Sequence, residues 1–206
     1  MNCAGSGDAM TDTQPDFLST REAAKLLGLS LTTMQLWVEA GILPAWKTAG
    51  GHRRIPRHAI EEFRAKQQVS VQDEAVNPPV VLVVDDDPIV LTLCRQHFSD
   101  WDLPVRLVTA EDGYNGLIEI GRCNPALIIT DLDMPGMDGF EMIRRISLRQ
   151  QQPVGSIVVV TGLPPHQIEK RGGVPDGITV FSKPIPFDAL NVLVVNIAKN
   201  RISLKA

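Results

Sequence analysis

Residues 128–139 read IITDLDMPGMDG, an apolar run that ends in Asp131 and Asp133 and then breaks into a turn rich in Pro and Gly. Other apolar runs of strand length alternate with helical patterns on either side of it: VVLVV at 80–84, VRLVTA at 105–110, SIVVVT at 156–161 and TVFS at 179–182. Continuous apolar strands separated by helices are typical of a parallel sheet covered on both faces. The sequence therefore predicts an α/β fold, a five-stranded doubly wound parallel sheet, over residues 80–206.

Polar residues fall at the predicted carboxyl ends of these strands, where doubly wound sheets form their sites. Asp85 and Asp86 follow the first strand, Asp131 the third, Thr161 the fourth and Lys183 the fifth. Carboxylates that converge in one crevice repel each other, so their charge and oxygen chemistry favour a hard divalent cation, and we expect Mg²⁺. Such a cation and the Lys183 ammonium would receive the charge of a phosphoryl group, and the Thr161 hydroxyl could hydrogen-bond one of its oxygens.

Four motifs, VVLVVDDDP, ALIITDLDMPGMDG, VVVTG and VFSKP, follow one another in this order. Together they make residues 80–206 similar to the receiver domain of bacterial two-component response regulators, which has a flavodoxin-like sheet. The resemblance implies that Asp131 is the phospho-acceptor and that Asp86 is a direct metal ligand with Asp85 as its acidic partner. It also implies that the backbone carbonyl of Asp133 completes the metal site. Asp87, one position beyond the acidic pair, is expected to cap a helix.

The same resemblance assigns the remaining polar groups and a partner. Lys183 would bind the phosphoryl group, with a cis bond to Pro184, and Thr161 would move toward the phosphate on activation. A histidine kinase or a phosphotransfer protein would be the donor. Two departures stand out: Val180 occupies the position of the usual aromatic, with Phe181 next to it, and several Pro and Gly residues predict a short fourth helix near 165–171.

Residues 17–68 have a different character, with a net charge of +4 against −3 from Ala75 onward. A small basic module joined to an acidic one suggests a polyanionic partner. Ser19 or Thr20 with Glu22 predicts a capped helix, and Ser30 begins a second helix that runs to about Ala40. Two short extended pieces then flank a Gly-Gly pair before a third helix, so the pattern predicts a winged helix-turn-helix.

The segment LPAWKTAGGHRRIP makes this module resemble the winged helix-turn-helix of the MerR and excisionase families. That resemblance implies double-stranded DNA as a partner, with the second helix in the major groove and the wing on the backbone. The residues that would face the groove are Thr32, Thr33 and Gln35. Those that would contact phosphates or the adjacent minor groove are Lys47, His52, Arg53, Arg54 and Arg57. Trp37 and Trp46 are expected to pack in the core.

The predicted organisation is a disordered tail at 1–16, the winged domain at 17–68, a linker at 69–79 and the receiver at 80–206. The first residues lack the basic and apolar regions of a signal peptide, and no apolar run approaches the ~20 residues of a membrane span. Three widely spaced cysteines indicate reduced thiols. We therefore expect a soluble cytoplasmic protein without membrane contact.

These features together predict a regulator that is not an enzyme. It would accept a phosphoryl group on Asp131 and change the DNA binding or assembly of its first domain, and we expect a homodimer or an array on DNA. Two alternatives remain open at this point. The pair Asp131 and Asp133 also fits a haloacid-dehalogenase-like aspartyl phosphatase with Asp133 as general acid. The chain could also be a receiver-containing adaptor for protein interactions that does not bind DNA.

Overall fold

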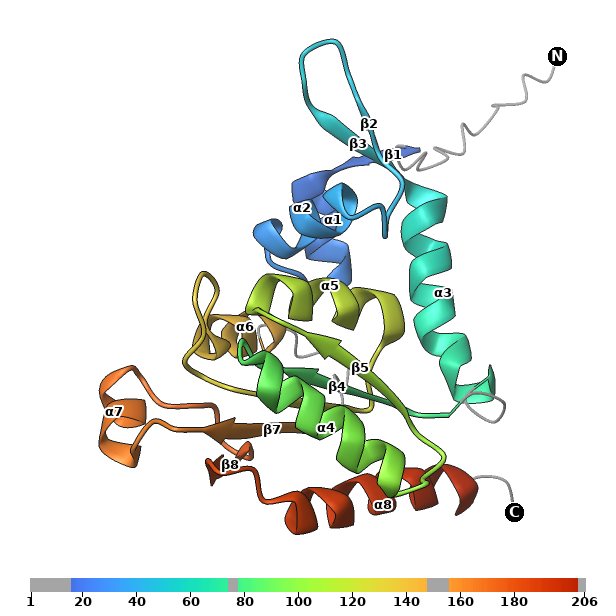
Figure 1. Cartoon of the computed structure of the whole chain (residues 1–206). Coiled ribbons are helices and arrows are strands. Elements are labelled where there is room, and N and C mark those ends of the chain that lie inside the picture. The colour runs from blue at the N-terminus through green and yellow to red at the C-terminus, as the bar shows by residue number, and fades with distance from the viewer. Residues whose placement is uncertain (1–15, 74–77, 148–155, 204–206) are drawn as a thin grey trace, which may run out of the picture.

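The computed structural model describes residues 16–73, 78–147 and 156–203. The predicted tail at 1–16, apart from Asp16, lies outside these residues. A small N-terminal part rests on one side of a larger α/β part (Figure 1). Among the described residues, no helix combines the length and the apolar character that a membrane crossing requires.

The larger part is built on five parallel strands in the order β5-β4-β6-β7-β8. This is the doubly wound, flavodoxin-like order, so the predicted fold class is confirmed. The strands are β4 (Val80–Val84), β5 (Arg106–Ala110), β6 (Leu127–Thr130), β7 (Ser156–Thr161) and β8 (Thr179–Ser182).

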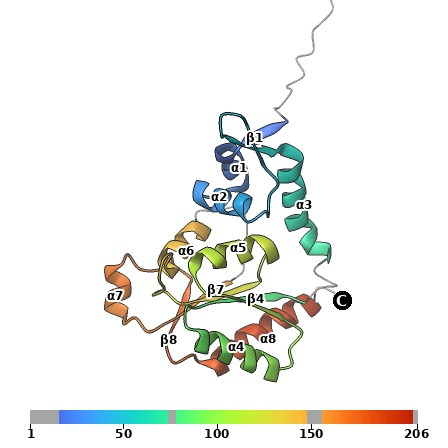
Figure 2. The ribbon, with the colours of Figure 1, turned by 45° about the horizontal axis from the view of Figure 1, so that its top comes forward.

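Helices cover both faces of this sheet, α4 and α8 on one side and α5, α6 and α7 on the other (Figures 1 and 2). Their bounds are α4 (Pro88–Asp100), α5 (Gly113–Cys123), α6 (Gly139–Ser147), α7 (Pro165–Lys170) and α8 (Phe187–Ser203). Alternate residues of β4 enter the two cores, because side chains of a strand point to opposite faces. Val83 packs in the cluster of Leu91 and Leu190, and Leu82 in that of Leu117.

The two predicted departures from the receiver pattern are present in the fold. Helix α7 has 6 residues, and Gly172 and Gly173 with positive φ follow it. Val180 is 39% exposed on β8, whereas Phe181 packs into the core on the other face of the sheet. An aromatic ring therefore occupies the neighbouring position and points away from the face that Val180 presents.

The smaller part forms the predicted winged helix-turn-helix, with a short first strand that the sequence reading did not include. Its elements are β1 (Phe17–Ser19), α1 (Thr20–Leu27), α2 (Leu31–Glu39), β2 (Trp46–Lys47), β3 (Arg53–Pro56) and α3 (Arg57–Asp73). Ser19 and Glu22 make the predicted capping box at the start of α1, and Ser30 caps α2. The strands form an antiparallel sheet in the order β1-β3-β2.

One expectation for this part needs correction, and one helix is longer than its predicted extent. Trp37 is buried as predicted, but Trp46 is 44% exposed and packs edge-on against Phe17, with ring centroids 4.6 Å apart. Trp46 lies on a two-residue strand at the edge of a three-stranded sheet, a position that leaves much of the indole exposed. Helix α3 continues to Asp73, beyond the boundary predicted at residue 68 and into the predicted linker. Residues 74–77 of that linker lie outside the described residues.

Candidate functional site

The acidic crevice lies where β4 and β6 end side by side. The ladder of the sheet fixes both ends, because the Asp131 N–H donates to the Val84 carbonyl at 3.0 Å and the Asp85 N–H to the Ala110 carbonyl at 3.1 Å. Asp85 and Asp131 are buried, at 3% and 6% exposure, whereas Asp86 is exposed. The side chain of Asp87 accepts from the Ile89 N–H at 2.8 Å and so caps α4.

Lys183 joins the two buried carboxylates. Its Nζ lies 2.8 Å from Asp85 Oδ2 and 2.6 Å from Asp131 Oδ2. Burial by itself lowers the pKa of Lys183, but the hydrogen bonds to Asp131 and Asp85 outweigh it and the pKa is raised. The bond from Lys183 to Pro184 is cis, as the family resemblance implied. The ammonium therefore stays charged and partly neutralises the crevice.

The other oxygen of Asp131 is held by the backbone. Asp131 Oδ1 accepts from the N–H groups of Leu132 and Asp133, the second at 3.1 Å. Thr161, 1% exposed, ends β7, and its Oγ1 accepts from the Leu163 N–H at 3.3 Å. The Thr161 carbonyl accepts the Lys183 N–H at 2.8 Å. The Thr161–Lys183 backbone hydrogen bond and the Lys183–Asp131 side-chain hydrogen bond thus connect these three residues at one edge of the sheet.

Asp85, Asp86 and Asp131 could together hold a metal ion. Each offers a carboxylate oxygen, and these oxygens lie within 4.8 Å of one another. Burial raises the pKa of Asp85, although the hydrogen bond from Lys183 acts in the opposite direction. Three converging carboxylates with a single adjacent ammonium leave negative charge unneutralised, and oxygen donors suit a hard cation. The residues therefore fit Mg²⁺.

The side chain of Asp133 is held by a residue that the sequence reading missed. Arg171, just after α7, donates to Asp133 Oδ1 at 2.9 Å and to Asp138 Oδ2 at 2.8 Å, and its guanidinium lies over the Phe140 ring. Arg171 is 38 positions from Asp133 in the sequence, so no local pattern connects them. The ion pairs of Arg171 with Asp133 and Asp138 therefore connect the segment after β6 to the end of α7.

Gly139 is a second residue that the sequence did not single out. A Cβ at this position would lie 2.0 Å from the backbone oxygen of Asp131. The Gly139 N–H donates to the Leu132 carbonyl at 3.1 Å, so the segment closes on itself between Asp131 and the start of α6. A glycine is required here because two stretches of backbone touch.

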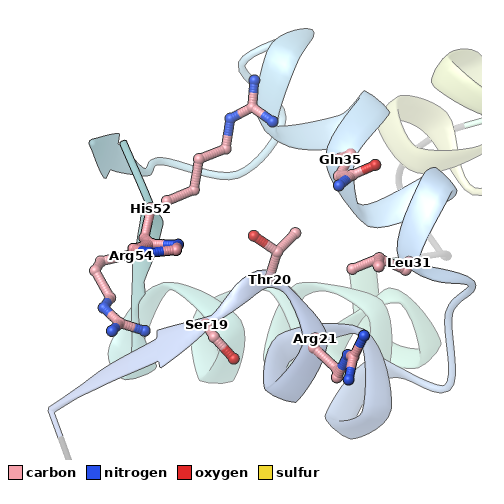
Figure 3. Close-up of a pocket in the computed structure, with 8 residues that line it drawn as sticks. Ser19, Thr20, Arg21, Leu31, Gln35, His52 and Arg54 are labelled. Atoms are coloured by element: carbon pink, nitrogen blue, oxygen red, sulfur yellow. The ribbon is translucent and has the colours of Figure 1, made fainter. Parts of the chain in front are cut away.

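On the winged domain, several of the predicted contact residues surround a hollow of about 290 Å³ (Figure 3). Its lining comes from the end of β1, the start of α1, from α2 and from β3 with the residue before it. The lining residues are Ser19, Thr20, Arg21, Leu31, Gln35, His52, Arg53 and Arg54. Four of these residues were not predicted as DNA contacts: Ser19, Thr20 and Arg21 near the start of α1, and Leu31 on α2. The first three enter the set because the start of α1 lies beside β3 in space.

The remaining predicted contacts differ in exposure. Thr32 and Lys47 are exposed, and Arg57 is half-buried at the start of α3. Arg53 is paired with Glu39 at 2.7 Å. Thr33 was expected to face the groove, but it is 2% exposed and its hydroxyl pairs with that of Ser30 at 2.8 Å. We therefore remove Thr33 from the contact set, since its side chain completes the N-terminal cap of α2.

A flavodoxin-like parallel sheet with an Asp, Thr and Lys crevice at its carboxyl edge defines a receiver-type domain, and here a helix-turn-helix precedes it. The sequence model of the response regulator receiver domain family matches residues 81–194, more than half of the chain, and a helix-turn-helix domain family matches residues 17–68. The chain belongs to the response regulator receiver domain family, with an N-terminal helix-turn-helix domain.

Curated relatives share part of the chain. Hybrid signal transduction histidine kinase D of Dictyostelium discoideum is 31% identical over 150 residues, which are 71% of this chain and 9% of that protein. Transcriptional regulatory protein GlrR of Escherichia coli K12 is 34% identical over 121 residues, 55% of this chain and 24% of that protein. The chain therefore spans only a small share of the length of these relatives.

Solved structures agree on the fold of the larger part. The signal receiver domain of an HD domain-containing protein from Pseudomonas fluorescens Pf-5 matches with a TM-score of 0.52 and 25% identity, covering 63% of this chain and 93% of that one. A sensor protein from Polaromonas sp. JS666 matches with a TM-score of 0.51 and 21% identity, covering 60% and 98%.

Proposed function

We propose that this chain is a phosphorylation-responsive, DNA-binding response regulator in which Asp131 accepts a phosphoryl group. The observation that carries the proposal is the contact of Lys183 with both Asp131 and Asp85 at the edge of the sheet. An ammonium in this position can follow the acceptor oxygen and bind the phosphoryl oxygens as their charge develops. Thr161, at the adjacent strand end, supplies a hydroxyl for the same oxygens.

The reaction requires little covalent chemistry from the protein. One oxygen of the Asp131 carboxylate attacks the phosphorus of a phosphohistidine on the donor protein. The new P–O bond forms as the P–N bond breaks, and the imidazole leaves with the bonding electrons and becomes protonated. When bound by Asp85, Asp86 and Asp131, with the Asp133 carbonyl, Mg²⁺ supplies positive charge for the acceptor and phosphoryl oxygens. The donor is a histidine kinase or a phosphotransfer protein.

The product is an acyl phosphate whose persistence makes it a signal. The phosphatase alternative needs Asp133 as general acid beside Asp131. The Asp133 side chain is 63% exposed, and its Oδ1 accepts a hydrogen bond from Arg171 at 2.9 Å. Because this ion pair holds the Asp133 side chain against Arg171 and not against Asp131, the contact counts in favour of a receiver.

For the winged domain we propose double-stranded DNA as the ligand. Support comes from the hollow lined by Arg21, Arg53 and Arg54, beside the uncharged polar Gln35 on α2. Arginines would contact phosphates, and the Gln35 amide can pair with an adenine edge. Transcriptional regulators among the relatives agree with this assignment. One winged module reads a short half-site, so we expect two or more copies on an operator.

One experiment tests both the proposed phosphorylation of Asp131 and the proposed DNA binding of the winged domain. Protein is incubated with Mg²⁺ and acetyl phosphate, phosphoryl uptake is followed on a phosphate-retarding gel, and a DNA sequence selected from a random pool is titrated with and without the donor. We expect uptake and a change in DNA affinity in the natural protein, and neither in Asp131→Asn. Asp133→Asn is the matched control, because it removes a nearby carboxylate and keeps the acceptor. Equal uptake in Asp131→Asn would refute the proposed acceptor.

A further inference from the structure

Helix α2, which carries the predicted groove-reading residues, also contacts the receiver. The indole N–H of Trp37 donates to the backbone carbonyl of Leu117 in α5 at 2.9 Å, across 80 positions of sequence. Leu36 beside it packs against the receiver cluster that contains Leu117 and Ile120. The two domains are therefore joined by a hydrogen bond and an apolar contact between α2 and α5.

Gly121, one helical turn after Leu117, fits this contact closely. A Cβ at Gly121 would lie 2.5, 2.7 and 2.8 Å from three atoms of the Trp37 indole. Glycine is among the least favourable residues inside a helix, and Gly121 lies within α5. The close approach of the indole to the α5 backbone is the feature of this structure that requires it.

The DNA-facing side of α2 is a different side. Leu31 and Gln35, one turn apart, line the hollow beside β3, and Glu39, a further turn on, pairs with Arg53. Residues four apart lie on the same face of a helix, so this face is separate from that of Leu36 and Trp37. Figures 1 and 2 agree, since α2 lies between α5 and the wing. Docking on α5 leaves the hollow open.

Helix α5 also touches the segment that follows the acceptor. The Gly113 N–H donates to the Met137 carbonyl at 3.3 Å, and a Cβ at Gly113 would lie 2.6 Å from that oxygen. Met134 and Met137 pack in the same cluster as Leu117. A rearrangement of the segment between Asp131 and Gly139 would therefore change its contacts with α5. The same helix holds Trp37 at the carbonyl of Leu117.

We propose that α5 is the docking surface of the winged domain and the route by which the acceptor segment acts on it. In this arrangement the receiver alters the placement of a DNA-binding face that is already open, through the Trp37–Gly121 contact. The coupling half of this inference rests on the proposed phosphorylation of Asp131. The docking half does not, because it concerns the unphosphorylated chain.

The test uses Gly121→Ala in the full chain. Alanine favours the helix but its methyl group meets the Trp37 indole, so the variant should fold and lose the contact. Arg122→Gln, the next residue on the same helix, is the matched control. Exchange of the Trp37 indole proton, followed by ¹⁵N NMR, should be slow in the natural protein and the control. It should be about tenfold faster or more in Gly121→Ala.

The second measurement is the change in DNA affinity on treatment with acetyl phosphate. Gly121→Ala should bind DNA and take up the phosphoryl group as the natural protein does, yet lose the response that joins them. Unchanged indole exchange in this variant would overturn the docking. Faster exchange with an intact DNA response would overturn the coupling. Trp37→Phe keeps an aromatic ring without the N–H donor, so it must lose the response as well.

A natural protein that takes up phosphate without any DNA response would contradict the proposed function, and with it the coupling. The indole measurement would still decide the docking, since it needs no phosphodonor. Failure of the proposed function and failure of the proposed docking therefore give different results.

Discussion

Gly139→Ala is the most direct test of the geometry around Asp131, the proposed phospho-acceptor. An added Cβ would lie 2.0 Å from the Asp131 oxygen, 2.9 Å from the Asp131 carbonyl carbon and 2.9 Å from the Leu132 Cα. Real Cβ atoms do not approach other atoms closer than 3.0 Å. All three neighbours are backbone atoms, so no flexible side chain can move aside, and the backbone at Asp131 must move by about 1 Å.

Two magnitudes follow from that displacement. Forcing an extra carbon into packed structure costs about 1–3 kcal/mol, so the free energy of unfolding should fall by that amount. A reacting group misplaced by ~1 Å can lose about 10²-fold in rate, so phosphoryl uptake from acetyl phosphate should slow by a similar factor. Urea unfolding followed by circular dichroism measures the first effect, and the phosphate-retarding gel measures the second.

Gly50→Ala is the control for a Gly to Ala change without a clash. A Cβ at Gly50 would meet only the His52 ring carbon at 3.6 Å, an ordinary contact, and this residue lies in the wing. It should leave phosphoryl uptake unchanged. If Gly139→Ala kept both the urea midpoint and the rate of phosphoryl uptake of the natural protein, the inferred close contact between Gly139 and the Asp131 backbone would be refuted.

Three further substitutions have defined outcomes. Burial raises the pKa of Asp85, so the folded chain binds a proton on this carboxyl group more tightly than the unfolded chain does. The free energy of unfolding therefore falls as the pH rises from 3.8, the pKa in the unfolded chain, through the pKa in the folded chain. Asp85→Asn should remove this loss of stability, so its urea unfolding midpoint at pH 7, measured with a metal chelator present, should be higher than that of the natural protein. A lower midpoint would contradict this prediction. Arg171→Gln frees the exposed Asp133 carboxylate to orient water, so the acyl phosphate should decay several-fold faster while stability falls by no more than about 1 kcal/mol; an unchanged decay rate would argue against this role. Arg54→Gln should weaken binding to all DNA sequences and reduce the slope of log affinity against log salt by about 1, and a full slope would exclude a phosphate contact.

The sequence predicted most of the receiver site because strand ends are local signals. Asp85 and Asp131 each follow a short apolar run, and parallel strands bring their carboxyl ends to one edge of the sheet. Lys183 follows the last strand in the same way. Given the fold class, the meeting of these side chains requires no further information.

The winged domain was less completely predictable. Caps at Ser19 and Ser30 are local and were read correctly. The exposure of a single position is not a local property. Thr33 is buried where its hydroxyl pairs with that of Ser30, and Trp46 is exposed on β2, an edge strand of its sheet. Composition favours the opposite assignment in each case, since hydroxyl groups are mostly exposed and indoles are mostly buried.

By itself, the sequence determined the alternation of strands and helices, the acceptor Asp131 as a candidate and a basic winged module ahead of it. These depend on hydrophobic period, caps and turns, which act over a few residues. Only the tertiary structure decided that Arg171 holds Asp133, that Gly139 meets the backbone of Asp131, and that Trp37 docks on α5. Those contacts join positions far apart in the chain, and long-range packing leaves no periodic trace in the sequence from which they could be read.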